Sequence, residues 1–141
     1  QKWTLFPYTT LFRSDRNRIR QEVLPVLEAL HPGCSRRMAE LSERVSQVQD
    51  TQSALVKLSL DHLQREDGAL KRPPLQQLPA SARRLVLHGW LQAQGMPSLP
   101  ARQIKELSAA IGPRQPPGER HLAGRKRLHW CRDWVQLEDK S

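Results

Sequence analysis

The sequence predicts a mainly α-helical fold in which one long connecting helix and several short helices precede a small C-terminal β-hairpin element. The stretch from Ser35 to Glu66 contains neither Gly nor Pro, the residues that most often interrupt a helix. The chain's 11 Pro residues all lie outside this stretch and divide the remainder into short units. Polar and apolar residues alternate over 127–131, which is the pattern of a β-strand.

The segment 1–14 is expected to be non-native. Residues 7–14, with the sequence PYTTLFRS, back-translate into eight successive codons of a widely used sequencing adapter. The alternative is a genuine edge strand, for which the aromatic and threonine side chains are suited by propensity. Without this segment, residues 15–141 keep 21 Lys and Arg residues against 14 Asp and Glu residues, a net charge of +7.

The first predicted helix begins at Asp15, a suitable N-cap, and ends at His31-Pro32-Gly33. Pro25 either kinks it or starts a second segment, because proline lacks a backbone donor and crowds the preceding turn. Arg16 and Arg20 share one side of this helix with two apolar residues. Guanidinium groups on a packing surface need an anionic partner, either a neighbouring carboxylate or a bound phosphate or carboxylate.

The long helix is predicted to start at a Ser35 cap and to run to about Glu66. It carries an apolar seam at alternating spacings of three and four residues, interrupted by Gln52. The seam consists of Met38, Leu41, Val45, Val48 and Leu55. We expect it to be the spine against which the shorter helices pack, and the alternative is pairing in a coiled-coil dimer.

The C-terminal half is predicted to begin with a linker at Arg72-Pro73-Pro74, followed by a helix over Pro79–Gln94 and a short helix capped by Ser98. The apolar side of the short helix is expected at Ile104, Leu107 and Ile111. A hairpin of two or three strands follows, with a turn near Arg132-Asp133. Because an isolated hairpin is only marginally stable, it must pack on the helices.

The charge balance points to a polyanionic partner. The chain has 23 Lys and Arg residues against 14 Asp and Glu residues, a net charge of +9, and nucleic acid is the commonest polyanion of the cytosol. The absence of an 18-residue apolar run excludes a membrane span. Cys34 and Cys131 are isolated, which is typical of a reducing cytoplasm, and neither they nor the five His residues have metal-ligand spacing, so no metal site is predicted.

Two groups of basic residues are candidate RNA contacts. Arg125-Lys126-Arg127 lies next to Trp130 and Trp134, a combination that suits phosphate contact with base stacking. Each Trp can equally anchor the hairpin, and we favour that core role. Arg83 and Arg84 near the start of the middle helix are either a solvated surface or a second patch that binds the RNA backbone.

The run from Arg16 to Leu27 resembles the Arg-Asn-x-Ile-Arg-x-x-x-Leu-Pro-x-Leu motif of the tRNA(Ile)-lysidine synthetases. The downstream order is also similar: a Leu-Pro and an Arg-Arg-Leu helix with Trp, then Gln94-Gly95, a short helix, and a basic hairpin ending in Trp134-Val135-Gln136-Leu137. The resemblance covers residues 15–138.

The resemblance implies part of a cytoplasmic ATP-dependent ligase that uses magnesium and joins lysine to the wobble cytidine of tRNA(Ile) with a CAU anticodon. The family's Ser-Gly-Gly-x-Asp-Ser phosphate-binding loop is absent from the sequence. We therefore expect no catalytic residue in this chain and no activity of the chain alone. Arg16, Asn17 and Arg20 are expected to complete the active site or contact the substrate.

The resemblance also implies a division of the chain. Residues 15–33 would end a truncated catalytic domain, 34–70 would form the connecting helix, and 71–141 would form an accessory tRNA-contacting region. In that region the expected tRNA-binding residues are Arg83, Arg84, Arg125, Lys126 and Arg127. Two alternatives remain: a free-standing basic RNA-binding module and a helical scaffold that pairs through the apolar seam.

Overall fold

The computed structural model describes residues 15–139, which fall into two compact units, the first ending at Val48 and the second beginning at Gln49. The chain is mainly helical and ends in a small antiparallel sheet, which confirms the predicted fold class. No helix among the described residues combines the length and apolar character that a membrane span requires.

The first unit is helical but contains a wider turn just before Pro25. The helix starting at Asp15 passes into a π-helical turn, η1 (Ile19–Val23), and continues as α2 (Leu24–Leu30). A proline ring crowds the carbonyl four residues earlier in an α-helix, so the structure accommodates Pro25 at the first turn of a new segment. The prediction that Pro25 disturbs the helix is confirmed.

The connection to α3 (Cys34–Leu63) is held by the carboxylate of Glu28. It accepts hydrogen bonds from the backbone N–H of Gly33 at 2.6 Å and from that of Ser35 at 3.0 Å. The bonds from Ser35 and then Gly33 hold the pKa of Glu28 below its ordinary value. Glu28 therefore supplies the cap that the sequence predicted for the side chain of Ser35.

The apolar seam of α3 is exposed, and the prediction that shorter helices pack on it is wrong. Each of its five residues is at least 50% exposed. The second unit instead packs toward the C-terminal end of the helix, where Leu60 and Leu63 contact its core. One turn earlier, Gly89 of α5 (Ala80–Ala93) lies so close to Val56 that a Cβ at Gly89 would be 2.5 Å from the Val56 Cγ1.

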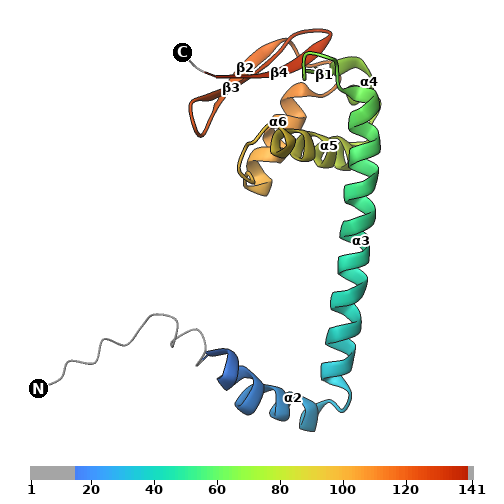
Figure 1. Cartoon of the computed structure of the whole chain (residues 1–141), viewed down its shortest axis with the longest axis vertical. Coiled ribbons are helices and arrows are strands. Elements are labelled where there is room, and N and C mark those ends of the chain that lie inside the picture. The colour runs from blue at the N-terminus through green and yellow to red at the C-terminus, as the bar shows by residue number, and fades with distance from the viewer. Residues whose placement is uncertain (1–14, 140–141) are drawn as a thin grey trace, which may run out of the picture. The chain divides into compact units, whose positions relative to one another are not determined.

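The second unit combines short helices with a four-stranded sheet in the order β1-β4-β3-β2, in which each paired strand is antiparallel. Figure 1 shows α5 and α6 lying together next to this sheet. Its elements after α3 are β1 (Leu70–Lys71), α4 (Arg72–Gln77), α5, α6 (Ala101–Ile111), β2 (Gly118–Leu122), β3 (Lys126–Trp130) and β4 (Trp134–Asp139).

Two local predictions in this unit are wrong. Arg72-Pro73-Pro74 begins α4 instead of forming a linker, because prolines in the first helical turn sacrifice no intrahelical hydrogen bond. Helix α6 begins at Ala101, and its N-cap is Pro100 with no side-chain cap, so Ser98 lies outside the helix. The helix over 79–94 and the strand over 127–131 are confirmed to within a residue or two.

The core lies between the helices and one face of the sheet, and two tryptophans anchor it. Trp90 is 1% exposed and donates its indole N–H to the Gly68 carbonyl at 2.9 Å. Trp130 is 5% exposed and donates to the Pro116 carbonyl at 3.0 Å. For Trp130 the predicted core role is therefore confirmed. Other core residues are Leu70, Leu75, Leu87, Leu91, Ile104, Leu107, Ile111, Leu128 and Val135.

Candidate nucleic-acid interface

The structure divides the basic residues into those that hold the fold and those available to a ligand. Arg72 belongs to the first group, with 2% of its surface exposed. Its guanidinium donates to the carbonyls of Ile111 at 3.0 Å, Cys131 at 2.6 Å and Gln115 at 2.7 Å. Desolvation lowers the pKa of Arg72. This one side chain therefore ties α4 to the end of α6, the following loop and the β3–β4 turn.

Arg83 is also structural, so we remove it from the predicted tRNA-binding residues. It is 8% exposed, and its Nε donates to the Ser108 hydroxyl at 3.2 Å. Its Nη1 lies 3.5 Å from the Gln76 carbonyl and 3.4 Å from the Leu78 carbonyl. These contacts join α4, α5 and α6, so the fold itself uses most of this guanidinium.

Only one residue of the predicted Arg125-Lys126-Arg127 group is without an acidic partner among the described residues. Lys126 forms an ion pair with Asp139, at 2.6 Å between Nζ and Oδ1. Arg127 pairs with Glu138 at 2.6 Å and with Glu119 at 3.3 Å, and these carboxylates raise its pKa. These three ion pairs across the sheet offset the positive charge of the strands.

Arg125 is exposed at the tip of the β2–β3 turn, where its φ of 58° follows Gly124 at 71°. Such left-handed conformations are typical of the tight turns that join two strands of a hairpin. Three more exposed arginines without an ion pair in the described part of the chain surround the sheet. With Arg125, these sheet cations are Arg114, Arg120 and Arg132.

The sheet cations occupy both ends of the sheet. Arg125 lies in the β2–β3 turn and Arg132 in the β3–β4 turn, and consecutive turns of an antiparallel meander lie at opposite ends. Arg120 lies on β2, and Arg114 lies in the loop before it, with a φ of 62°. Four exposed arginines without an ion pair in the described residues are thus distributed around the sheet, and guanidinium groups suit the spaced phosphates of a nucleic acid.

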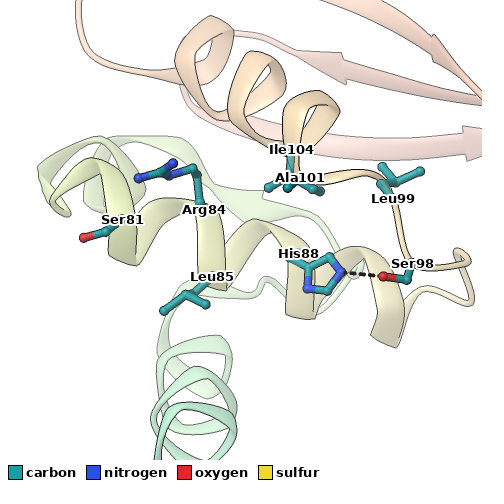
Figure 2. Close-up of a pocket in the computed structure, with 8 residues that line it drawn as sticks. All are labelled: Ser81, Arg84, Leu85, His88, Ser98, Leu99, Ala101 and Ile104. Atoms are coloured by element: carbon teal, nitrogen blue, oxygen red, sulfur yellow. Dashed lines mark hydrogen bonds between the residues drawn. The ribbon is translucent and has the colours of Figure 1, made fainter. Parts of the chain in front are cut away.

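Arg84, the neighbour of Arg83 in the chain, lies on a groove between α5 and α6 with a volume of about 440 Å³. Its Nε donates to the Ala80 carbonyl at 3.2 Å, which leaves the rest of the guanidinium half-exposed. Figure 2 shows this groove, in which His88 and Ser98 are joined by a 3.2 Å hydrogen bond. The remaining lining residues are Ser81, Leu85, Leu99, Ala101 and Ile104.

The predicted active-site-completing residues lie at the start of the first unit. Arg16, Asn17 and Arg20 are all exposed. Neither arginine forms an ion pair within the described residues, whereas the intervening Arg18 pairs with Glu22 at 3.4 Å. The two guanidiniums are therefore free for an anionic ligand.

Comparison with known proteins gives one consistent result. Residues 70–135 match the family described as the TilS substrate binding domain. A tRNA(Ile)-lysidine synthase of Parasynechococcus marenigrum is 46% identical over 87% of this chain and 36% of its own length. Proteins of the same name from two Prochlorococcus marinus strains are 31% and 34% identical over 89% and 86% of this chain, and over 39% and 36% of their own lengths. The chain thus spans little more than a third of these relatives.

Proposed function

The chain belongs to the tRNA(Ile)-lysidine synthase family, and from that premise we propose that its second unit binds tRNA(Ile) for lysidine formation. The observation that carries the proposal is the position of the sheet cations. All four lie within residues 70–135, the segment that matches the substrate binding domain. Arg84 lies in the same segment and is a further candidate contact.

The proposed contacts are mainly to phosphates. Arginine forms bidentate hydrogen bonds with phosphate oxygens, and the sheet cations have no carboxylate to release first among the described residues. Contacts of this kind fix the orientation of a nucleic acid without reading its sequence. We therefore assign the second unit a role in positioning the tRNA.

The reaction proposed for the whole enzyme is the ATP-dependent joining of lysine to the wobble cytidine, with magnesium as the accompanying ion and the cytoplasm as its location. The described residues, 15–139, do not fit an ATP site. Four of the described glycines are isolated at positive φ in separate turns, and they form no glycine-rich phosphate loop. We therefore propose that the chain alone does not adenylate tRNA.

We keep the proposed division at residues 33–34 and 70–71, with 15–33 as the end of a catalytic domain, 34–70 as the connecting helix and 71–141 as the tRNA-contacting region. In this scheme Arg16, Asn17 and Arg20 approach the substrate or complete the active site. Their exposure and lack of acidic partners in the described residues support this role.

The proposal is tested by titrating a tRNA(Ile) transcript with the full chain at several salt concentrations. Substituting Ala for Arg114, Arg120, Arg125 and Arg132 should weaken binding and reduce the steepness of the salt dependence, by roughly 0.7–0.9 in log–log slope for each phosphate that is no longer neutralised. The matched control is Arg102→Ala, because Arg102 is exposed but already pairs with Glu106 at 2.9 Å. Unchanged affinity in the fourfold variant, or an equal decrease in the control, would contradict the proposal.

A further inference from the structure

We propose that Trp134, with His129 beside it, is a stacking platform for an unpaired base of the bound RNA. This inference rests on the proposed function and deepens it, because the sheet cations account for phosphate contacts but not for contact with bases. The platform lies on the outer face of the sheet, which we define as the face opposite the core.

The register of the strands places Trp134 on this outer face. Leu128 is opposite Leu137, and Trp130 is opposite Val135, and these side chains point to the core. Because successive residues of a strand point to opposite faces, Trp134 and His129 point away from the core. The two rings meet there, with centroids 5.2 Å apart and planes at 71°.

Trp134 differs from the other two tryptophans in the described residues. Trp90 and Trp130 are buried, and each donates its indole N–H to a carbonyl. Trp134 is only half-buried, and within the described part of the chain its indole N–H has no hydrogen-bond partner. Its contact with His129 is nearly perpendicular, so His129 covers at most one face of the indole. The core does not require this ring, which is the property expected of a ligand-binding aromatic residue.

The charges around Trp134 suit an RNA strand. Lys71 is its register partner on β1 and is exposed, with its Nζ donating to the His62 carbonyl at 3.1 Å. Arg132 lies two residues before Trp134 in the β3–β4 turn. The one acidic residue of that turn is Asp133. The carboxylates further along the outer face, Glu119 and Glu138, are already paired with Arg127. A base on Trp134 would thus have positive side chains near its own phosphates.

The test compares two RNA probes with the full chain: the stem-loop that carries the anticodon, and a fully base-paired duplex of the same stem. Stacking on an aromatic side chain is worth about 1–3 kcal/mol per base, so Trp134→Ala should weaken stem-loop binding roughly 5- to 140-fold. Duplex binding and the salt dependence should not change, because the indole contacts no phosphate. Trp134→Phe should retain most of the affinity, and Gln136→Ala on the same face should bind like the wild type.

Fluorescence provides a readout that does not depend on the stability of the Ala variant. In a Trp3→Phe background, the stem-loop should quench the emission of the chain, and adding Trp134→Phe should remove that quenching. Equal stem-loop affinity of Trp134→Ala and wild type, or quenching that persists in Trp134→Phe, would overturn the platform while leaving the proposed function intact. If the wild-type chain binds neither probe, the proposed function fails and the platform fails with it.

Discussion

The role of Arg72 gives the sharpest test of how the second unit is held together. Its guanidinium donates to three carbonyls that lie 39 to 59 residues away in the chain. In Arg72→Met, a side chain of similar length fills the space, but the carbonyls of Ile111, Gln115 and Cys131 lose their charged donor. Each buried acceptor left unsatisfied costs about 1–3 kcal/mol.

These costs do not add fully, because the loop around Gln115 is exposed and water can replace part of the missing hydrogen bonding. We therefore expect Arg72→Met to lower the free energy of unfolding by about 3–5 kcal/mol, which is less than the sum of three hydrogen bonds from a charged donor at about 1.5–3 kcal/mol each. Arg72→Lys should recover only part of this decrease, because one ammonium group cannot reach three separate carbonyls in the fork geometry of a guanidinium.

The assay is urea unfolding followed by tryptophan emission, since Trp90 and Trp130 report on the core of the second unit. Arg102→Met is the matched control, because that side chain is 90% exposed and an exposed pair on a helix contributes at most about 1 kcal/mol. A decrease below about 1 kcal/mol in Arg72→Met, or one equal to that of the control, would refute the structural role of Arg72.

Three further predictions follow from individual contacts. Arg83→Met should lower stability by about 1–3 kcal/mol in the same assay without changing the salt dependence of tRNA binding, because Arg83 is bonded inside the fold; a flatter salt dependence would return it to the interface. Leu41→Gln with Val48→Gln should reduce self-association in sedimentation experiments without lowering the melting temperature, because both side chains are exposed; an unchanged association constant would mean that the seam is not a contact surface. Glu28 has a lowered pKa in the folded chain, so its contribution to helix stability is present above its ordinary pKa of 4.5 and is lost as the pH falls through the lowered value. Circular dichroism should show this acid-induced loss of helix in the wild type and a smaller pH dependence in Glu28→Gln; identical pH profiles would contradict the cap.

The helices and the sheet could largely be predicted from the sequence, because they depend on local patterns. The spacing of Ile104, Leu107 and Ile111 predicts the buried side of α6 without knowledge of what packs on it. Strand β1 could not be found in this way, since it has only two residues and is defined by its pairing with β4. Periodicity likewise marked the apolar seam of α3 but could not show whether another element covers it.

The basic residues were less predictable, because their roles depend on tertiary contacts. Arg83 and Arg84 are adjacent in the chain but point about 100° apart around a helix, so one is buried and the other reaches the groove. Arg72 precedes two prolines, a pattern that predicts a linker, whereas the carbonyls to which it donates come from distant segments. Which residue of the basic hairpin remains unpaired was likewise set by the strand register, which places Glu138 opposite Arg127.

The central claim is that the second unit contacts tRNA through the sheet and its turns, and hydrogen exchange tests it most directly. The exchange of backbone amides in the full chain would be compared with and without the tRNA(Ile) transcript. The salt concentration would be low, and enough tRNA would be present to saturate the chain. We predict slower exchange in the turns that contain Arg125 and Arg132 and in the loop at Arg114, where the unpaired cations lie. Protection confined to the first unit, or no protection in these turns, would contradict the account.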